Sequence, residues 1–151
     1  MTLRAVAIDL DGALGDTRGL WRAWLDDARR RLRVELDVPD DRGDAAVMLD
    51  ELIGNWRVLV ERFAEEHAPV YLRPRAEASA ALRRLHADGV RLGTFTDAPE
   101  ELARVALGQL GAARRLDAVA AGANACERLL EQLGPDAEVV HDAADLARLA
   151  P

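Results

Sequence analysis

Two aspartates, Asp9 and Asp11, stand one residue apart where a mostly apolar run of the sequence ends. That run, residues 3–9, is typical of a strand buried on both faces. Side chains two residues apart in an extended chain point the same way, so the two carboxylates are expected to lie close together. Like charges at that distance repel, and a hard divalent cation such as Mg²⁺ would satisfy both. The pair then suits phosphoryl transfer, in which one carboxylate attacks phosphorus and the other carries a proton to the leaving oxygen.

The same residues also have a simpler interpretation. Asp11 and Gly12 form an Asp-Gly pair, a strong turn signal, and two solvated acids in a turn need no function. Gly12 is compatible with both interpretations, because glycine permits the sharp turn that brings backbone N–H groups toward a phosphate. The elements and motifs around Asp9 and Asp11 are needed to distinguish a solvated turn from a phosphoryl-transfer site.

Apolar spacing predicts two helices after the first strand, over residues 20–36 and 44–66, the second bent at Gly54 and Asn55. From Pro74 onward, helices and strands alternate: a helix over 75–87, a strand over 90–96, a helix from Pro99 to Gly111, a strand over 116–120, a helix over 123–133, a strand over 137–141 and a short last helix. This order predicts an α/β fold, a Rossmann-like parallel sheet of about four strands with helices on both faces. Residues 1–16 and 73–151 would form the core domain, and residues 17–72 an inserted helical cap. Asp9 would lie at the carboxyl end of its strand, where open sheets bind ligands.

The stretch "DLDGALGDT" resembles the first motif of the haloacid dehalogenase (HAD) superfamily, Asp-x-Asp-Gly-x-Leu-x-Asp-Ser/Thr. The matching positions are Asp9, Asp11, Gly12, Leu14, Asp16 and Thr17. The resemblance implies an aspartyl-phosphate mechanism with Asp9 as the nucleophile, Asp11 as the acid and then the base, and Mg²⁺ as the cofactor. Dehalogenases of this superfamily generally lack the second aspartate, so Asp11 favours phosphoryl transfer over carbon–halogen cleavage.

Two later stretches resemble further motifs of the same superfamily. "LRPRAEASAALRRLHADGVRLGTFTDAP" is similar to the segment that leads to the second motif, which implies that Thr96, with Asp97 beside it, binds the phosphate together with Gly12. "VVHDAADLARL" stands in the place of the fourth motif. It implies that Asp142 and Asp145 bind the metal with Asp9 and Asp11. The alternative for Asp142 is the N-cap of the last helix.

The sequence departs from the superfamily pattern at its third motif, which is usually a lysine. All twenty basic residues of this chain are arginines, and the segment in question, "ANACE", is short. Arg128 is the nearest cation and the candidate replacement as a phosphate-binding residue. The alternative is that Arg128 lies on a helix surface. His141 stands where the fourth motif usually has glycine.

Composition limits the other functions. The chain has 151 residues, a net charge of −7 and one cysteine, Cys126. These values predict one domain with a sizeable core and no internal disulfide, in a reducing cytoplasm. The acidic balance and the lack of a long apolar run argue against nucleic acid and membrane as partners. A four-stranded sheet would leave exposed edges, and a homodimer is one way to cover them.

Three tryptophans, Trp21, Trp24 and Trp56, all fall within the predicted cap. They are interpreted as a small core between its helices, with a wall over the substrate as the alternative. A helical cap leaves modest room above the site, which suits a small phosphorylated metabolite as partner. The sequence therefore predicts a Mg²⁺-dependent phosphohydrolase. Two alternatives remain open: a catalytically impaired relative that binds a phosphate ligand or a protein partner, and a phosphomutase.

Overall fold

The centre of the molecule is a parallel sheet of four strands. The computed structural model describes residues 2–151, and the strands run in the order β3-β2-β1-β4. They are β1 (Ala5–Asp9), β2 (Arg91–Thr96), β3 (Ala118–Ala121) and β4 (Glu138–Val140). The expected α/β fold is confirmed. Because β1 pairs with both β2 and β4, Asp9 leaves the sheet between two neighbouring strands.

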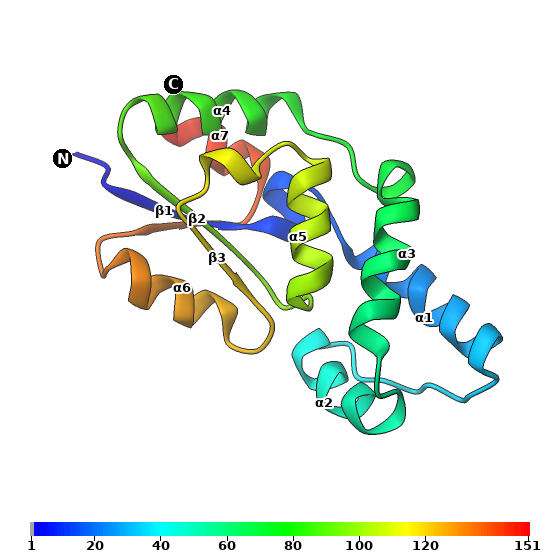
Figure 1. Ribbon diagram of the computed structural model, residues 1–151. Coiled ribbons are helices and arrows are strands. Elements are labelled where there is room, and N and C mark those ends of the chain that lie inside the picture. The colour runs from blue at the N-terminus through cyan, green and yellow to red at the C-terminus, as the bar shows by residue number, and fades with distance from the viewer. Residues whose placement is uncertain (1) are drawn as a thin grey trace.

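Helices cover both faces of this sheet. On one face, α4 (Ala76–Ala87) packs beside α7 (Ala143–Leu149), and α6 (Ala125–Leu133) covers the other (Figure 1). Strand β1 serves both layers, since Val6 and Ile8 belong to the larger core while Ala5 and Ala7 face the core under α6. Its continuous apolar sequence follows from this burial on both faces.

Three helices lie between β1 and β2 in the chain: α1 (Arg18–Leu32), α2 (Arg42–Leu52) and α3 (Trp56–Tyr71). The single helix expected over residues 44–66 is thus two helices, separated where Ile53 is extended and Gly54 follows it. The first helix also ends earlier than expected, because Arg33 adopts a left-handed conformation (φ 53°). Leu36 is buried all the same, in the connection to α2.

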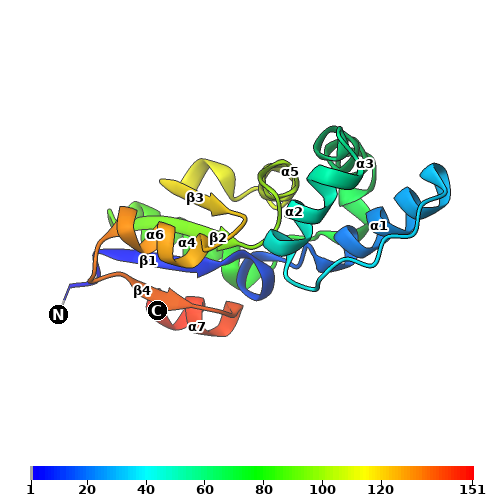
Figure 2. The same ribbon diagram turned by 90° about the horizontal axis from the view of Figure 1, so that it is seen from below.

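The helical segment packs around its tryptophans and against the rest of the protein. Trp21, Trp24 and Trp56 have ring centroids 5.4–6.1 Å apart and are almost fully buried, so they form the core between α1 and α3. Helix α3 also packs against α5 (Glu100–Gln109), which follows β2 (Figure 2). A short 3₁₀ helix, Ala113–Arg115, then leads to β3.

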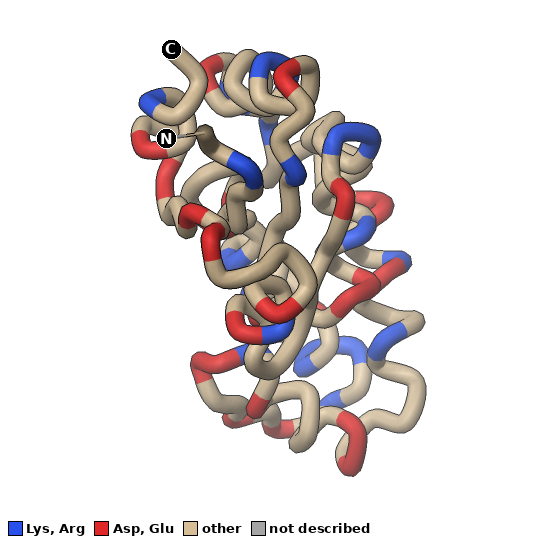
Figure 3. Tube along the Cα trace, turned by 90° about the vertical axis from the view of Figure 1, so that its left-hand side faces the viewer, with Lys and Arg blue, Asp and Glu red and all other residues tan. Residues whose placement is uncertain are grey.

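Acidic and basic positions are interspersed along the described chain in the view of Figure 3. Among residues 2–151, none of the helices is both long and apolar enough to cross a membrane.

Candidate functional site at the carboxyl end of the sheet

A tight turn directly follows β1 and begins the site. It spans Leu10–Leu14, where Asp11 and Gly12 have non-helical dihedral angles, and it is closed by hydrogen bonds from Gly12 N to Gly15 O (2.7 Å) and from Gly15 N to Leu10 O (3.0 Å). Gly12 has φ +125°, and a Cβ there would collide with the carbonyl oxygen of His141. Only glycine satisfies both conditions, because L-residues rarely adopt this φ. The turn thereby lets the loop after β1 rest on the end of β4.

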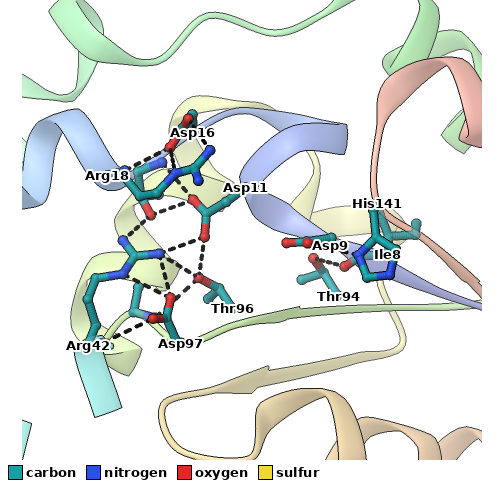
Figure 4. Close-up of polar contacts among 12 residues, drawn as sticks. Ile8, Asp9, Asp11, Asp16, Arg18, Arg42, Thr94, Thr96, Asp97 and His141 are labelled. Carbon is teal, nitrogen blue, oxygen red and sulfur yellow. Dashed lines mark hydrogen bonds and ion pairs between the residues drawn. The ribbon is translucent and has the colours of Figure 1, made fainter. Parts of the chain in front are cut away.

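The carboxylate of Asp11 lies at the centre of a hydrogen-bond cluster (Figure 4). Its Oδ1 accepts the backbone N–H and the hydroxyl of Thr17, both at 2.7 Å. Its Oδ2 accepts the hydroxyl of Thr96 at 2.7 Å and the guanidinium of Arg42 at 2.7 Å. The Asp11 side chain is 9% exposed. The structure therefore brings Asp11 and Thr96 into direct contact, although their strands are far apart in sequence.

Arg42 is a site residue that the sequence analysis did not identify. It is the first residue of α2, its side chain is only 3% exposed, and all three of its guanidinium nitrogens donate hydrogen bonds. Nε and Nη2 donate to Asp97 Oδ1, at 3.0 and 2.8 Å, and Nη1 donates to the hydroxyl of Thr17 at 2.6 Å. Residues 38–43 have turn chemistry and no apolar pattern, so nothing in the sequence signals that this arginine is buried.

Asp97 holds Arg42 from the other side. Its carboxylate also accepts the backbone N–H of Arg42 at 3.0 Å. Burial alone would raise the pKa of Asp97, but the hydrogen bonds and the positive charge of Arg42 lower it below the ordinary value. Asp97 is therefore an ionised anchor for the start of α2, which differs from the phosphate contact that its place beside Thr96 implies.

Asp9 stands apart from this cluster. Its Oδ2 lies 3.1 Å from Nδ1 of His141, whose ring meets Phe95 edge-on at a centroid distance of 6.0 Å. Burial raises the pKa of Asp9, the contact with His141 lowers it, and the charge of Asp11 raises it again. The net result is a pKa above the ordinary value. Such a carboxylate is poorly compensated by the protein and suited to react or to bind a cation.

The negative charge of Asp11 should have a measurable effect on the pKa of Asp9. In the metal-free protein, Asp11→Asn removes a neighbouring negative charge, so we expect the pKa of Asp9 to fall relative to the wild type. A carbon-13 NMR titration of the Asp9 carboxyl group measures this shift. An unchanged or higher pKa of Asp9 in the variant would show that the two carboxylates do not interact.

A cavity of about 390 Å³ opens beside Asp9. Its walls are formed by the end of β1, the end of β2, the start of α2 and the start of α6, with Asp9, Asp11, Arg18, Asp41, Arg42, Phe95, Thr96, Asp97, Gly122, Asn124, Ala125, Cys126 and Glu127 as lining residues. A second cavity, of about 510 Å³, lies between α1 and the start of α2 and shares Arg18, Arg42 and Asp97 with the first. Asp9, Asp11 and Thr96 thus border one space that a small molecule can enter.

Arg128 is directed elsewhere. Its guanidinium donates to the carbonyl oxygens of Ala123 (3.0 Å) and Ala121 (2.5 Å), and it borders a different cavity, together with Arg104. In this arrangement its donors fix the loop after β3. The phosphate contact expected of Arg128 stays a prediction, and this geometry does not favour it.

The acids expected to bind metal with Asp9 are engaged in local contacts. Asp142 is the N-cap of α7, with Oδ1 accepting from Asp145 N at 2.7 Å, and Asp145 forms an ion pair with Arg148. Within residues 2–151, no three His, Cys, Asp or Glu side chains are grouped so that they could hold a metal ion. Mg²⁺ usually binds through one or two carboxylates plus waters and substrate phosphates. The described residues therefore form no closed protein cage, and Asp9 is the carboxylate at this cavity that would hold Mg²⁺ if waters and a substrate phosphate supplied the other ligands.

Comparison with solved structures shows which proteins share this fold. CbbY from Rhodobacter sphaeroides, in complex with phosphate, matches with a TM-score of 0.70 at 16% identity, over 97% of this chain and 84% of that chain. A HAD phosphatase from Thermococcus onnurineus matches with 0.58 at 21% identity, over 98% and 83%. A hydrolase from Pseudomonas syringae matches with 0.65 at 15% identity, over 99% and 81%.

This likeness is one of fold. No family model matches the sequence, and no curated protein sequence matches it either. The structures that match include a HAD phosphatase and a dehalogenase, so the resemblance carried by "DLDGALGDT" is confirmed at the level of the fold.

Proposed function

We propose that this chain, which has the fold of HAD-superfamily phosphatases and hydrolases, is a phosphohydrolase that acts on a small organic phosphate. One observation carries the proposal. Asp9 opens to a cavity of about 390 Å³ whose walls also present Asp11 and Thr96, in contact with each other at 2.7 Å. A nucleophile, a proton carrier and a hydroxyl that donates to a phosphate oxygen would thus meet around one small ligand.

The reaction would proceed in two steps. In the first, an Asp9 carboxylate oxygen attacks phosphorus and forms a P–O bond, while the bond from phosphorus to the alcohol oxygen breaks and its electron pair leaves with that oxygen. Asp11 gives a proton to the departing alcohol. In the second, water attacks the same phosphorus, Asp11 takes a proton from the water, and the bond to Asp9 breaks. Inorganic phosphate leaves, and both aspartates return to their first state.

Two further parts belong to the proposal. Residues 17–72 would act as a cap over a core formed by residues 1–16 and 73–151, because the start of α2 borders the cavity at Asp9. Mg²⁺, held by Asp9 and Asp142, would neutralise negative charge on the phosphoryl group when bound. Asp9 faces the cavity already, whereas Asp142 would have to release the N-terminus of α7.

A second candidate function is supported by the state of Asp11. Its two oxygens accept four hydrogen bonds, so neither is free to carry a proton to a leaving group until one donor moves away. A protein in which these contacts never open would bind a phosphate ligand without turning it over. This is the catalytically impaired relative that the absence of lysine also suggests.

Hydrolysis of p-nitrophenyl phosphate, with and without Mg²⁺, separates the two candidates. The proposed function predicts release of p-nitrophenol on the order of 1 s⁻¹ or faster with Mg²⁺ present, and loss of that activity when EDTA removes the metal. A small sugar phosphate is assayed in parallel by release of inorganic phosphate. Binding of inorganic phosphate without hydrolysis of either substrate would contradict the enzyme and support the binding protein.

A further inference from the structure

The site needs a positive charge, and this chain has no lysine to provide one. Among residues 2–151, the arginines that border the cavity at Asp9 are Arg18 and Arg42. Arg18 is 57% exposed and pairs with Asp16 at 2.7 Å, and its hydrogen bonds lower the pKa of Asp16. Water and Asp16 therefore screen most of its charge. Arg42, at 3% exposure, is the arginine of this cavity that is shielded from solvent.

We propose that Arg42 binds the transferring phosphoryl group and neutralises its charge, the role that the HAD resemblance gives to a lysine. The inference rests on the proposed function, which places the phosphate at Thr96. Nη2 of Arg42 lies 2.7 Å from Asp11 Oδ2 and 3.3 Å from Thr96 Oγ1. The Thr96 hydroxyl donates its one hydrogen to Asp11 Oδ2, so it would turn away from Asp11 to donate to a phosphate oxygen, and that oxygen would then lie within reach of Nη2. Arg42 would then exchange its contact with Asp11 for one with phosphate, and this exchange frees Asp11 Oδ2 to carry a proton.

The surroundings of Arg42 prepare it for this role. Asp97 accepts from Nε, from Nη2 and from the backbone N–H, and Thr17 accepts from Nη1. The guanidinium therefore keeps its position while Nη2 exchanges its contact with Asp11 alone. A cation fixed in a region of low dielectric interacts more strongly with developing negative charge than a solvated one, and it needs no reorganisation during the reaction.

The local charge balance points the same way. The acids that border the cavity are Asp9, Asp11, Asp41, Asp97 and Glu127, and the cations are Arg18 and Arg42, of which Arg42 is the buried one. An ionised phosphate adds further negative charge to the same space. Without Arg42, the neighbouring carboxylates would repel the ligand.

Arg42 is the first residue of α2, so the positive charge at the site is supplied by the helical segment of residues 17–72. The start of α2 rests on the loop after β3, where a Cβ on Gly43 would lie 3.1 Å from Cα of Ala123. The absence of a side chain at Gly43 permits this approach. Phosphate binding and the docking of α2 against the loop are therefore coupled through Arg42.

Two variants of Arg42 and one control test the proposal. Arg42→Gln removes the charge, Arg42→Lys keeps it, and Arg104→Gln removes an arginine from an ion pair between α5 and α3 (Arg104–Glu61, 2.9 Å) outside the cavity. Each variant is assayed below its own unfolding midpoint, because loss of a buried ion-pair partner destabilises the protein. The measurements are kcat and KM for p-nitrophenyl phosphate and, separately, the stabilisation of each protein by inorganic phosphate.

We expect Arg42→Gln to lower kcat by about 10²- to 10³-fold, with a smaller change in KM. It should also weaken inorganic phosphate binding by about 10- to 100-fold, the range for hydrogen bonds to charged groups. Arg42→Lys should lose less than Arg42→Gln in both measurements, because it keeps the charge. Arg104→Gln should behave like the wild type.

These measurements test the role of Arg42 separately from the proposed phosphohydrolase function. If the wild type hydrolyses substrate and Asp9→Asn does not, but Arg42→Gln retains kcat within a few-fold, the role of Arg42 is wrong and the proposed function stands. If the wild type binds phosphate without turnover and Arg42→Gln loses that binding, the proposed function fails while the assignment of Arg42 to phosphate holds. Equal losses in Arg42→Lys and Arg42→Gln would contradict the neutralising role.

Discussion

Replacing Asp9 with asparagine should abolish phosphate ester hydrolysis, by roughly 10⁴-fold or more, and leave a folded protein. Asparagine has nearly the shape of aspartate, but its amide does not attack phosphorus, so no bond from residue 9 to the phosphoryl group can form. Because burial and the charge of Asp11 raise the pKa of Asp9, the ionised carboxylate destabilises the folded state at neutral pH. The variant should therefore also unfold at a higher temperature than the wild type. Steady-state hydrolysis and thermal unfolding measure the two effects.

The pH dependence of that stabilisation provides an internal control. The pKa of Asp9 in the folded protein lies above its ordinary value. The ionised Asp9 carboxylate therefore does not destabilise the fold below the pKa that Asp9 has in the unfolded chain, and it destabilises the fold fully above the pKa that Asp9 has in the folded protein. The advantage of Asp9→Asn should shrink as the pH falls through this range. Asp136→Asn, at an exposed position outside the cavity, is the matched substitution and should change neither turnover nor stability appreciably. Full activity in Asp9→Asn would assign the chemistry to another residue.

Replacing Asp11 with asparagine should lower turnover by about 10²- to 10⁴-fold, the range for loss of a general acid and base. The loss should depend on the leaving group. p-Nitrophenolate leaves without a proton, whereas the alkoxide of a sugar phosphate needs one, so we expect the larger loss with the sugar phosphate. The difference is measured as kcat/KM for both substrates with the same protein samples. This ratio reports the first step, whereas hydrolysis of the intermediate is common to both substrates.

The leaving-group comparison separates the chemistry of Asp11 from its structural role. Asp11 accepts from Thr17, Thr96 and Arg42, and an asparagine cannot accept all of these hydrogen bonds, so some loss of stability is expected. Partial unfolding of the variant would lower the hydrolysis rate of both substrates by the same factor. Equal losses of kcat/KM for the aryl and the sugar phosphate would therefore contradict a role for Asp11 as the acid, even if the variant were much less active.

The site residues that could be predicted from the sequence are those held in place by the strands of the sheet. Asp9 and Thr96 end parallel strands that pair with each other, and the carboxyl ends of such strands meet at one edge. The apolar run before Asp9, with the turn at Gly12, therefore locates the candidate site without knowledge of the side-chain packing. The contact of Asp11 with Thr96 follows from the same arrangement.

The parts that could not be predicted depend on how separate segments pack. Arg42 reaches Asp97 across 55 positions of the chain, and that contact exists because α2 docks against the loop after β3. No local pattern in residues 38–43 encodes it. For Arg128 and Asp142, local contacts replace the role in the site that the motif order implies. Arg128 donates to the backbone carbonyl oxygen of Ala123, and Asp142 caps the N-terminus of the helix that follows it.

In the proposed reaction, Asp9 carries the phosphoryl group between the two steps. We would mix the Asp11→Asn protein with p-nitrophenyl phosphate and Mg²⁺, quench the reaction with acid, and locate the phosphoryl group by peptide mass spectrometry. Asp11 is the base for the second step, so its removal should let the intermediate accumulate. We expect one phosphoryl group, on the peptide containing Asp9, and none when residue 9 is also asparagine. Release of p-nitrophenol without any phosphoryl group on that peptide would contradict the role of Asp9 as nucleophile.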